Sequence, residues 1–227
     1  MKFIRRLFRY SLYVAGALFV LSLAQVLAYR WLPVSHTPLM LLRAWEHRHD
    51  SAWTVRYQWV PRQAISPQMT LAVIASEDNR FEQHWGFDWY EIDRARNREK
   101  RTRIRGASTI TQQVAKNLFL WPQRSWLRKG LEAYYTVLIE CCWSKARIME
   151  VYLNIVETGA GTYGVEAAAQ RYYKKSALAL TASEAAMIAV CLPNPIRRNP
   201  AKPTAYLLKR RQAVLKLMGK IARPEFV

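Results

Sequence analysis

Acidic residues and cysteines are both scarce in this chain of 227 residues. It has 16 Asp and Glu against 35 Lys and Arg, which gives a formal net charge of +19. The three cysteines are an odd number, which excludes the paired framework of a small disulfide-stabilised domain. Cys141, Cys142 and Cys191 lie among apolar residues with helical spacing, so we expect buried thiols.

Internal repeats, low-complexity stretches and the pattern of a multistranded sheet are also missing. Only Val55, Tyr57 and Trp59 alternate like one short strand. Helical signals dominate after Pro61, where Ser66 precedes Pro67 as an N-cap would, and where Asp88 with Glu91 and Thr181 with Glu184 have capping-box spacing. We therefore predict a mainly α fold, with helices over residues 67–76, 125–143, 145–156, 165–173, 182–191 and 204–221.

The N-terminus has the pattern of a membrane anchor. Residues 1–9 include four basic side chains, and residues 10–29 are uncharged. Twenty helical residues at about 1.5 Å each span the ~30 Å hydrocarbon layer. The alternative is a cleaved signal peptide, but its apolar core should be only about 7 to 15 residues long. The basic segment favours a cytoplasmic N-terminus.

This anchor sets the expected organisation of the rest of the chain. We predict a connector over residues 30–60 and one catalytic-sized domain over residues 61–227, on the periplasmic side of the inner membrane. The positive charge of that domain is clustered in residues 94–105 and from residue 197 onward. Such clusters suit nucleic acid, anionic headgroups or phosphate esters, or are solvated faces. An anchored domain outside the cytoplasm rarely meets nucleic acid, so a phospholipid or a lipid-linked phosphate is the better partner.

Three segments combine polar side chains with a helical core pattern. In the first, Glu77 follows the apolar run of residues 71–75, so its carboxylate should emerge from an apolar wall. That setting suits a general base, and an ordinary ion pair with Arg80 is the alternative. His84 lies seven residues further on, and we interpret it as a hydrogen-bonding residue that shapes the loop.

The second segment, residues 105–119, begins with Gly106 and two residues that can cap a helix. Donors then crowd the first turns of the predicted helix, which suits an anion or a sugar at a helix N-terminus. Plain surface decoration is the alternative. The polar residues of this segment include Ser108, Thr109, Thr111, Gln112, Gln113, Lys116 and Asn117.

In the third segment, Arg124, Arg128 and Lys129 precede Glu132. Lys129 and Arg128 lie three and four residues before the glutamate, so a simple ion pair on a helix surface is a real alternative to a catalytic site. Taken alone, this segment does not decide between the two.

Five segments together resemble, in the same order, the motifs of the family 51 peptidoglycan glycosyltransferases. They are SEDNRFEQHWGFD, GASTITQQVAKNLF, RKGLEAYYTVLIE, KARIMEVYLNIVETGAGTYGVEAAAQRYY and LTASEAAMIAVCLPNP, and the resemblance covers residues 66–200. With one anchor and no length left for a penicillin-binding module, the chain is similar to the single-domain members. The resemblance implies a mainly helical, two-lobed domain related to lysozyme, whose smaller lobe touches the membrane.

The resemblance also implies the reaction and the roles of the residues. The family polymerises lipid II by inverting transfer onto an acceptor hydroxyl, and it releases undecaprenyl diphosphate. By motif position, Glu77 is the general base, while Glu132 assists the departing diphosphate either as an acid or by orienting cations. The implied diphosphate ligands are Lys116, Arg124 and Lys129, with hydrogen-bonding support from Ser108, Gln112 and Asn117.

No cofactor is expected to be required, although some family members respond to magnesium or manganese, and a weak divalent site near Asp78 stays open. The implied partners are lipid II, the growing glycan strand and the membrane, with no nucleic acid. Other cell-wall synthesis or division proteins are further candidates. Two alternatives remain: a lytic transglycosylase, which needs one acid and no cations for a diphosphate, and a tethered basic binding protein, which leaves Glu77 without a role.

Overall fold

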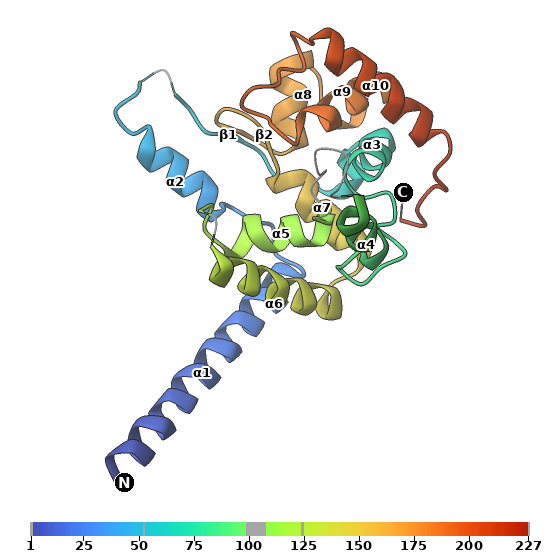
Figure 1. Cartoon of the computed structure of the whole chain (residues 1–227). Helices are drawn as coiled ribbons and strands as arrows, with labels where there is room; N and C mark the ends of the chain where they lie inside the picture. Colours follow the sequence, from blue (N-terminus) through green and yellow to red (C-terminus); the bar gives the residue numbers. More distant parts are fainter. Residues whose placement is uncertain (1, 52, 99–107, 124, 227) are drawn as a thin grey trace.

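The computed structural model describes residues 2–51, 53–98, 108–123 and 125–226. Its first helix, α1 (Lys2–Tyr29), projects from a helical domain that contains the rest of the chain (Figure 1). Most of this helix is exposed, and its segment Phe3–Tyr29 is long and apolar enough to cross a membrane. The helical class and the apolar N-terminal helix are therefore as predicted.

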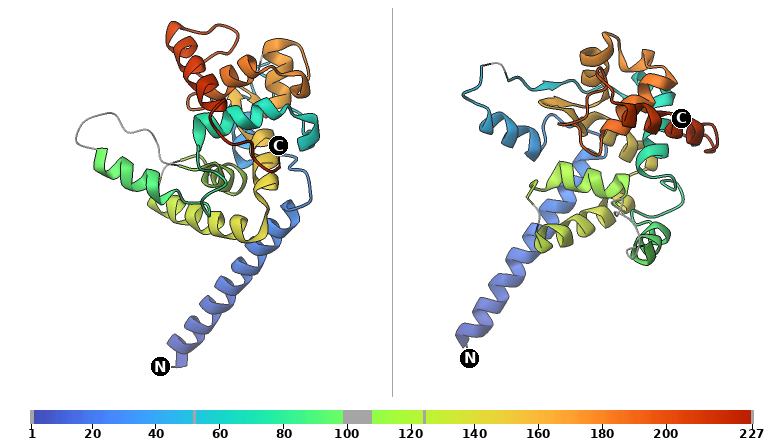
Figure 2. Two further views of the ribbon diagram at one scale, coloured as in Figure 1. Left: turned by 90° about the vertical axis from the view of Figure 1, so that its right-hand side faces the viewer. Right: turned by 45° about the horizontal axis from the view of Figure 1, so that its top comes forward.

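Two groups of helices make up the domain, and α7 (Lys145–Ile155) connects them. In the group near α1, helix α5 (Ile110–Phe119) packs against α7 and against α6 (Trp126–Cys142). In the group far from α1, helix α9 (Ala182–Cys191) packs against α3 (Pro67–Glu77) and α10 (Ala205–Met218) (Figure 2). The remaining helical segments are α2 (Pro38–Glu46), α4 (Trp89–Arg98), α8 (Val165–Tyr173), η1 (Arg62–Ala64) and η2 (Ala177–Ala179).

Side-chain caps explain where several helices begin. The Thr181 hydroxyl accepts a hydrogen bond from the backbone of Glu184, whose carboxylate accepts one in return, so the predicted capping box is confirmed. Ser66 does occupy the position before α3, but its hydroxyl donates to the Leu180 carbonyl at 2.8 Å instead of capping the helix. A hydrogen bond to a residue far along the chain therefore replaces the local cap that the sequence predicted.

The small sheet contradicts the expectation that only one isolated strand would form. Strands β1 (Arg56–Tyr57), β3 (Thr162–Tyr163) and β2 (Glu157–Gly159) lie in that order, with β1 parallel and β2 antiparallel to β3. Strands of two or three residues are too short to show a period-two pattern. Their pairing also depends on tertiary contact, because Arg56 lies opposite Thr162.

The segment expected to be a connector contains α2, which begins with Thr37 as an N-cap and Pro38 in the first turn. The Thr-Pro pair is a local signal in the sequence for the start of this helix. The segment is also fastened to the domain, because the Asn154 side chain accepts from Val60 N and donates to Val60 O, each at 2.9 Å.

The last two turns of α1 belong to the domain core. Val26 is fully buried, and its carbonyl accepts a hydrogen bond from the Trp143 indole at 2.8 Å. Ser22 Oγ lies 2.6 Å from Tyr134 Oη on α6. The Arg147 guanidinium donates to the Tyr29 carbonyl at 2.9 Å. The N-terminal helix and the rest of the domain therefore share one packed interface.

The cysteines only partly follow the prediction of buried thiols. Cys191 is buried in α9, whereas Cys141 is exposed and Cys142 is half-buried. The register of α6 places Cys141 on its outward face, together with Leu127 and Val137, which are also exposed. Apolar neighbours in sequence did not distinguish this outer face from the core.

Candidate active site

Glu77 is the last residue of α3, as the sequence predicted. The helix ends there because Asp78 leaves the helical region, with φ −156° and ψ 80°. The Glu77 side chain is half-buried, and its Oε2 accepts a hydrogen bond from the Gln113 amide at 3.2 Å. Ser76 Oγ lies 3.2 Å from Glu77 Oε1 and 3.3 Å from the Ala189 carbonyl, so one hydroxyl hydrogen serves two acceptors.

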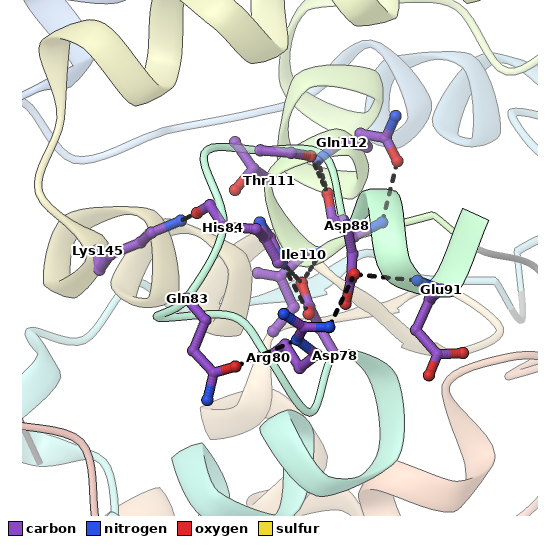
Figure 3. Close-up of polar contacts among 12 residues, drawn as sticks. Asp78, Arg80, Gln83, His84, Asp88, Glu91, Ile110, Thr111, Gln112 and Lys145 are labelled. Carbon is purple, nitrogen blue, oxygen red and sulfur yellow. Dashed lines mark hydrogen bonds and ion pairs between the residues drawn. The ribbon is translucent and has the colours of Figure 1, made fainter. Parts of the chain in front are cut away.

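The buried carboxylate of Asp78 connects the end of α3 to the start of α5. Its Oδ2 accepts the backbone N–H of Ile110 at 3.0 Å, and both oxygens lie within 3.1 Å of His84 Nε2 (Figure 3). An anion at a helix N-terminus is stabilised by the unpaired backbone donors there. Asp78 thus fixes the first turn of α5 beside Glu77.

A second set of buried groups holds the loop that follows Glu77. Lys145 Nζ donates to the His84 carbonyl at 2.7 Å and to Glu140 Oε1 at 2.8 Å. Thr109 Oγ1 donates to the Gly86 carbonyl at 2.6 Å. Gly86 has φ +78°, and a Cβ there would lie 2.5 Å from the Thr136 side chain. The predicted role of His84 in shaping this loop agrees with these contacts.

Asp78, His84 and Asp88 are the candidates for a divalent cation, because their ligand atoms lie within 4.8 Å of one another. Those atoms are already engaged. Asp78 receives His84 Nε2 and Ile110 N, while Asp88 Oδ1 receives the Glu91 backbone at 3.1 Å. Ligation through Nε2 would move the ring proton to Nδ1, which is buried and has no acceptor among the described residues. As arranged, these three residues do not fit a metal ion.

The predicted ligands on α5 divide into two sets. Gln112 forms a capping box with Thr109, because its Oε1 accepts the Thr109 N–H at 3.0 Å. Its amide oxygen is therefore used in starting the helix. Lys116 and Asn117 follow Gln113 by three and four residues and so share its face of α5, where both are half-buried. Ser108 lies exposed just before the helix.

Lys116 also lies within electrostatic reach of β2. Burial raises the pKa of Glu157, and the positive charges of Arg43 and Lys116 act against that rise. The cation on α5 is therefore close to the small sheet as well as to the residues around Glu77.

Glu132 lies buried on α6 with a cation at each oxygen. Arg128 donates to Oε2 at 2.8 Å, and Lys129 donates to Oε1. The two cations differ in exposure, since the side chain of Arg128 is 10% exposed and that of Lys129 is 45% exposed. The ion pairs that the spacing allowed do form along the helix, but the Glu132 carboxylate in them is buried.

Helix α5 is linked to Glu77 through Gln113, and it also packs on α6, the helix that carries Glu132. Arg124 and most of the 94–105 basic cluster lie outside the described residues, so their predicted roles are not placed.

Sequence reasoning did not single out Tyr152, Glu140 and Lys145, which support these side chains. A signal existed for Tyr152 and Glu140, because polar groups inside apolar helical patterns need buried partners.

A family model described as Transglycosylase matches residues 47–219. The chain belongs to the transglycosylase family. The match includes Glu77, Glu132 and all of α5, so the described site lies inside the family region.

Relatives of this transglycosylase match it over most of their length. A protein of Bacteroides thetaiotaomicron, named biosynthetic peptidoglycan transglycosylase, is 50% identical over 97% of this chain and 90% of its own. Proteins of the same name from Bdellovibrio bacteriovorus and Rhodospirillum centenum are 50% and 46% identical, covering 87% and 98% of this chain and 80% and 95% of their own. The similarity therefore extends beyond the family region into the N-terminal helix.

Proposed function

We propose that this transglycosylase polymerises lipid II into linear glycan strands by an inverting transfer that releases undecaprenyl diphosphate. The observation that carries the proposal is the pair of glutamates on two different helices, α3 and α6, which both lie against α5. Glu77, at the end of α3, accepts hydrogen bonds from Ser76 and Gln113, and Glu132, on α6, is bound to two cations. The two carboxylates are thus fitted for different parts of one reaction.

Glu77 acts as the general base in this proposal. It accepts the proton of the acceptor 4-hydroxyl as the oxygen forms its bond to the anomeric carbon of the donor. The bond between that carbon and the phosphate oxygen breaks, and its electron pair leaves with the diphosphate. A positioned carboxylate contributes about 10² to 10⁴ in rate to such a proton transfer.

Glu132 orients cations and is not the acid of the reaction. Both of its oxygens already accept from Arg128 and Lys129, and a diphosphate leaves as an anion without needing a proton. Lys129 is exposed enough to contact a phosphate while it stays paired with Glu132. Lys116 supplies a second cation from α5, and Arg124, Ser108, Gln112 and Asn117 stay predicted ligands.

The N-terminal helix places the domain at the membrane. If residues 10–29 fill the hydrocarbon layer, Ser22 lies seven residues, or about 10 Å, inside its outer edge. Ser22 contacts Tyr134, so this part of α6 must lie at a similar depth. The matching face of α6 carries no charge, and its members are Leu127, Gly130, Leu131, Tyr134, Val137, Leu138 and Cys141.

This depth brings the site close to a lipid-linked diphosphate that stays in the bilayer. The basic residues in the first turns of α1 favour a cytoplasmic N-terminus and a domain on the periplasmic side of the inner membrane. Trp126, which is 93% exposed at the start of α6, suits the membrane interface. Association with other cell-wall synthesis or division proteins stays a prediction.

Purified full-length protein incubated with lipid II should yield a polymer that muramidase digests. Glu77→Gln should keep its melting temperature and lose about 10² to 10⁴ in rate. Glu82→Gln is the matched control, because Glu82 is an exposed carboxylate in the adjacent loop. Wild-type polymerisation by Glu77→Gln would show that the base is elsewhere.

Two further arms complete this experiment. Cleavage of preformed glycan without polymer synthesis would favour a lytic enzyme. The same reaction in excess EDTA checks the expectation that no divalent cation is required.

A further inference from the structure

Tyr152 on α7 is linked by hydrogen bonds to the proposed base, Glu77, through one intermediate side chain. The tyrosine is fully buried, and its hydroxyl donates to Gln113 Oε1 at 3.3 Å. The Nε2 of the same amide donates to Glu77 Oε2 at 3.2 Å. Three helices, α7, α5 and α3, therefore contribute one side chain each to a chain of hydrogen bonds that ends on the Glu77 carboxylate.

The direction of this chain is fixed by the proton on Tyr152. Burial, together with the negative charges of Glu77 and Asp78, raises the pKa of Tyr152 well above its usual value of 10. The phenol therefore stays a donor at every pH at which the enzyme would work. Because a glutamine amide has an acceptor on one side and a donor on the other, its oxygen faces the tyrosine and its nitrogen faces Glu77.

Rotation of the Gln113 amide would place its oxygen against the Glu77 carboxylate, so two acceptors would meet. It would also place the amide nitrogen against the tyrosine hydroxyl hydrogen. The 3.3 Å contact of Tyr152 is longer than the usual O–H···O distance of about 2.7 to 2.8 Å. Its main effect is the orientation that it imposes on the amide, more than its own strength.

We propose that Tyr152 is a positioning residue for the reaction, which acts through Gln113 to hold the Glu77 carboxylate ionised and correctly oriented. The inference rests on the proposed role of Glu77 as the base. An amide N–H donor on a carboxylate oxygen favours the charged form and fixes the plane of the group. Tyr152 touches neither substrate nor reacting atoms, so its contribution should appear in turnover and pH dependence and not in substrate binding.

The primary test is Tyr152→Phe in the full-length protein, which removes one hydroxyl from a buried ring. We expect kcat for lipid II to fall about tenfold and KM to stay within about twofold, because misoriented catalytic groups reduce turnover without loss of binding. The acid limb of the pH–rate profile should move to higher pH, since the carboxylate loses a donor that favours its ionised form.

A double-mutant cycle with Gln113→Leu separates the relay from simple packing. If Tyr152 acts through the amide, Tyr152→Phe should have no further effect on kcat or on the pH profile once Gln113 is leucine. Tyr172→Phe is the matched control, because its hydroxyl also donates one hydrogen bond, to the Thr158 carbonyl at 3.2 Å, away from Glu77. This control should leave the profile unchanged.

Several results would overturn the inference. A wild-type profile for Tyr152→Phe, beside an inactive Glu77→Gln, would leave the proposed function standing and remove the relay. An equal loss of kcat in the Gln113→Leu background would assign Tyr152 to packing. If Tyr152→Phe lowers the melting temperature, Gln113→Asn must reproduce the shift in the acid limb, because its shorter amide cannot bridge both partners. Activity in Glu77→Gln would instead contradict the proposed function itself.

Discussion

Replacing Glu132 by glutamine should weaken both the fold and the binding of the diphosphate, because this carboxylate is the shared acceptor of two cations. Arg128 lies 2.8 Å from Oε2, and the side chains of this pair are 10% and 4% exposed. Glutamine has nearly the same shape but no charge. One cation would keep an acceptor oxygen, and the other would face the amide NH₂ group.

The size of the effect follows from the burial of Arg128. Removing one partner of a buried ion pair costs about 3 to 5 kcal/mol, since an uncompensated charge is left behind. The retained amide oxygen and the partly exposed Lys129 favour the lower end of this range, or about 3 kcal/mol. For a chain of this size, each kcal/mol lowers the melting temperature by about 2 to 4 °C, so we expect a decrease of about 6 to 12 °C.

Thermal unfolding of the detergent-solubilised protein, at one scan rate, measures this prediction. Glu46→Gln is the matched control, because the Arg43–Glu46 pair has the same 2.8 Å separation but side chains that are 38% and 39% exposed. Exposed pairs contribute about 0 to 1 kcal/mol, so this variant should melt within about 4 °C of wild type. A Glu132→Gln protein that melts no lower than the control would refute the reasoning from burial.

The same variant tests the proposed role of Glu132 against the acid role that the resemblance also allowed. If the carboxylate orients Lys129, then Lys129→Ala should reduce kcat/KM by a smaller factor in the Glu132→Gln background than in the wild type. If the carboxylate protonates the leaving group, the two substitutions should act independently and their free-energy effects should add.

Three further predictions concern other parts of the molecule. Lys116→Ala should weaken binding of a diphosphate-bearing lipid competitor by about 1.5 to 3 kcal/mol. The control is Lys209→Ala, which removes an exposed lysine of α10, and equal affinities in the two variants would remove Lys116 from the phosphate site. Trp126→Phe should reduce the quenching of tryptophan fluorescence by brominated lipids in vesicles, and unchanged quenching would mean that this side chain does not reach the bilayer. The pKa of Glu184 is lowered in the folded protein: burial acts to raise it, but hydrogen bonds from Lys175 and Thr181 lower it. The ionised Glu184 therefore stabilises the fold above its ordinary pKa of 4.5, and this stabilisation is lost as the pH falls through the lowered pKa of the folded state. The difference in melting temperature between wild type and Glu184→Gln should therefore shrink in acid, and a constant difference would contradict this.

Helix positions could be predicted from the sequence because the signals that start and stop helices are local. Thr181 and Ser125 cap the backbone within three residues, so their effect does not depend on the rest of the fold. For the same reason, the sequence could predict that Glu77 lies at the end of α3. Ser66 shows the limit, since its hydroxyl found the Leu180 carbonyl, which no local pattern could reveal.

The sequence could suggest candidate residues for the site but not the contacts between them. Spacing and resemblance identified Glu77 and Glu132, yet neither could place Tyr152 next to Gln113, because that contact depends on how α7 packs against α5. Likewise the spacing could not predict that the Asp78 carboxylate accepts the Ile110 N–H and so caps a helix that begins 32 residues further on.

The N-terminal helix illustrates a limit of composition itself. Lipid tails and a protein core both accept apolar side chains, so residues 10–29 could not be divided into a part that faces lipid and a part that faces the domain. The division is made by polar contacts: Ser22 with Tyr134, and the Val26 carbonyl with Trp143. Because these bonds fix α1 against α6, the proposed anchor would set the depth and the tilt at which α6, and Glu132 with it, meets the bilayer. A protein shortened to begin after Tyr29 would lose a buried side chain of the core as well as its anchor, so effects of that truncation on activity could not be assigned to membrane attachment alone.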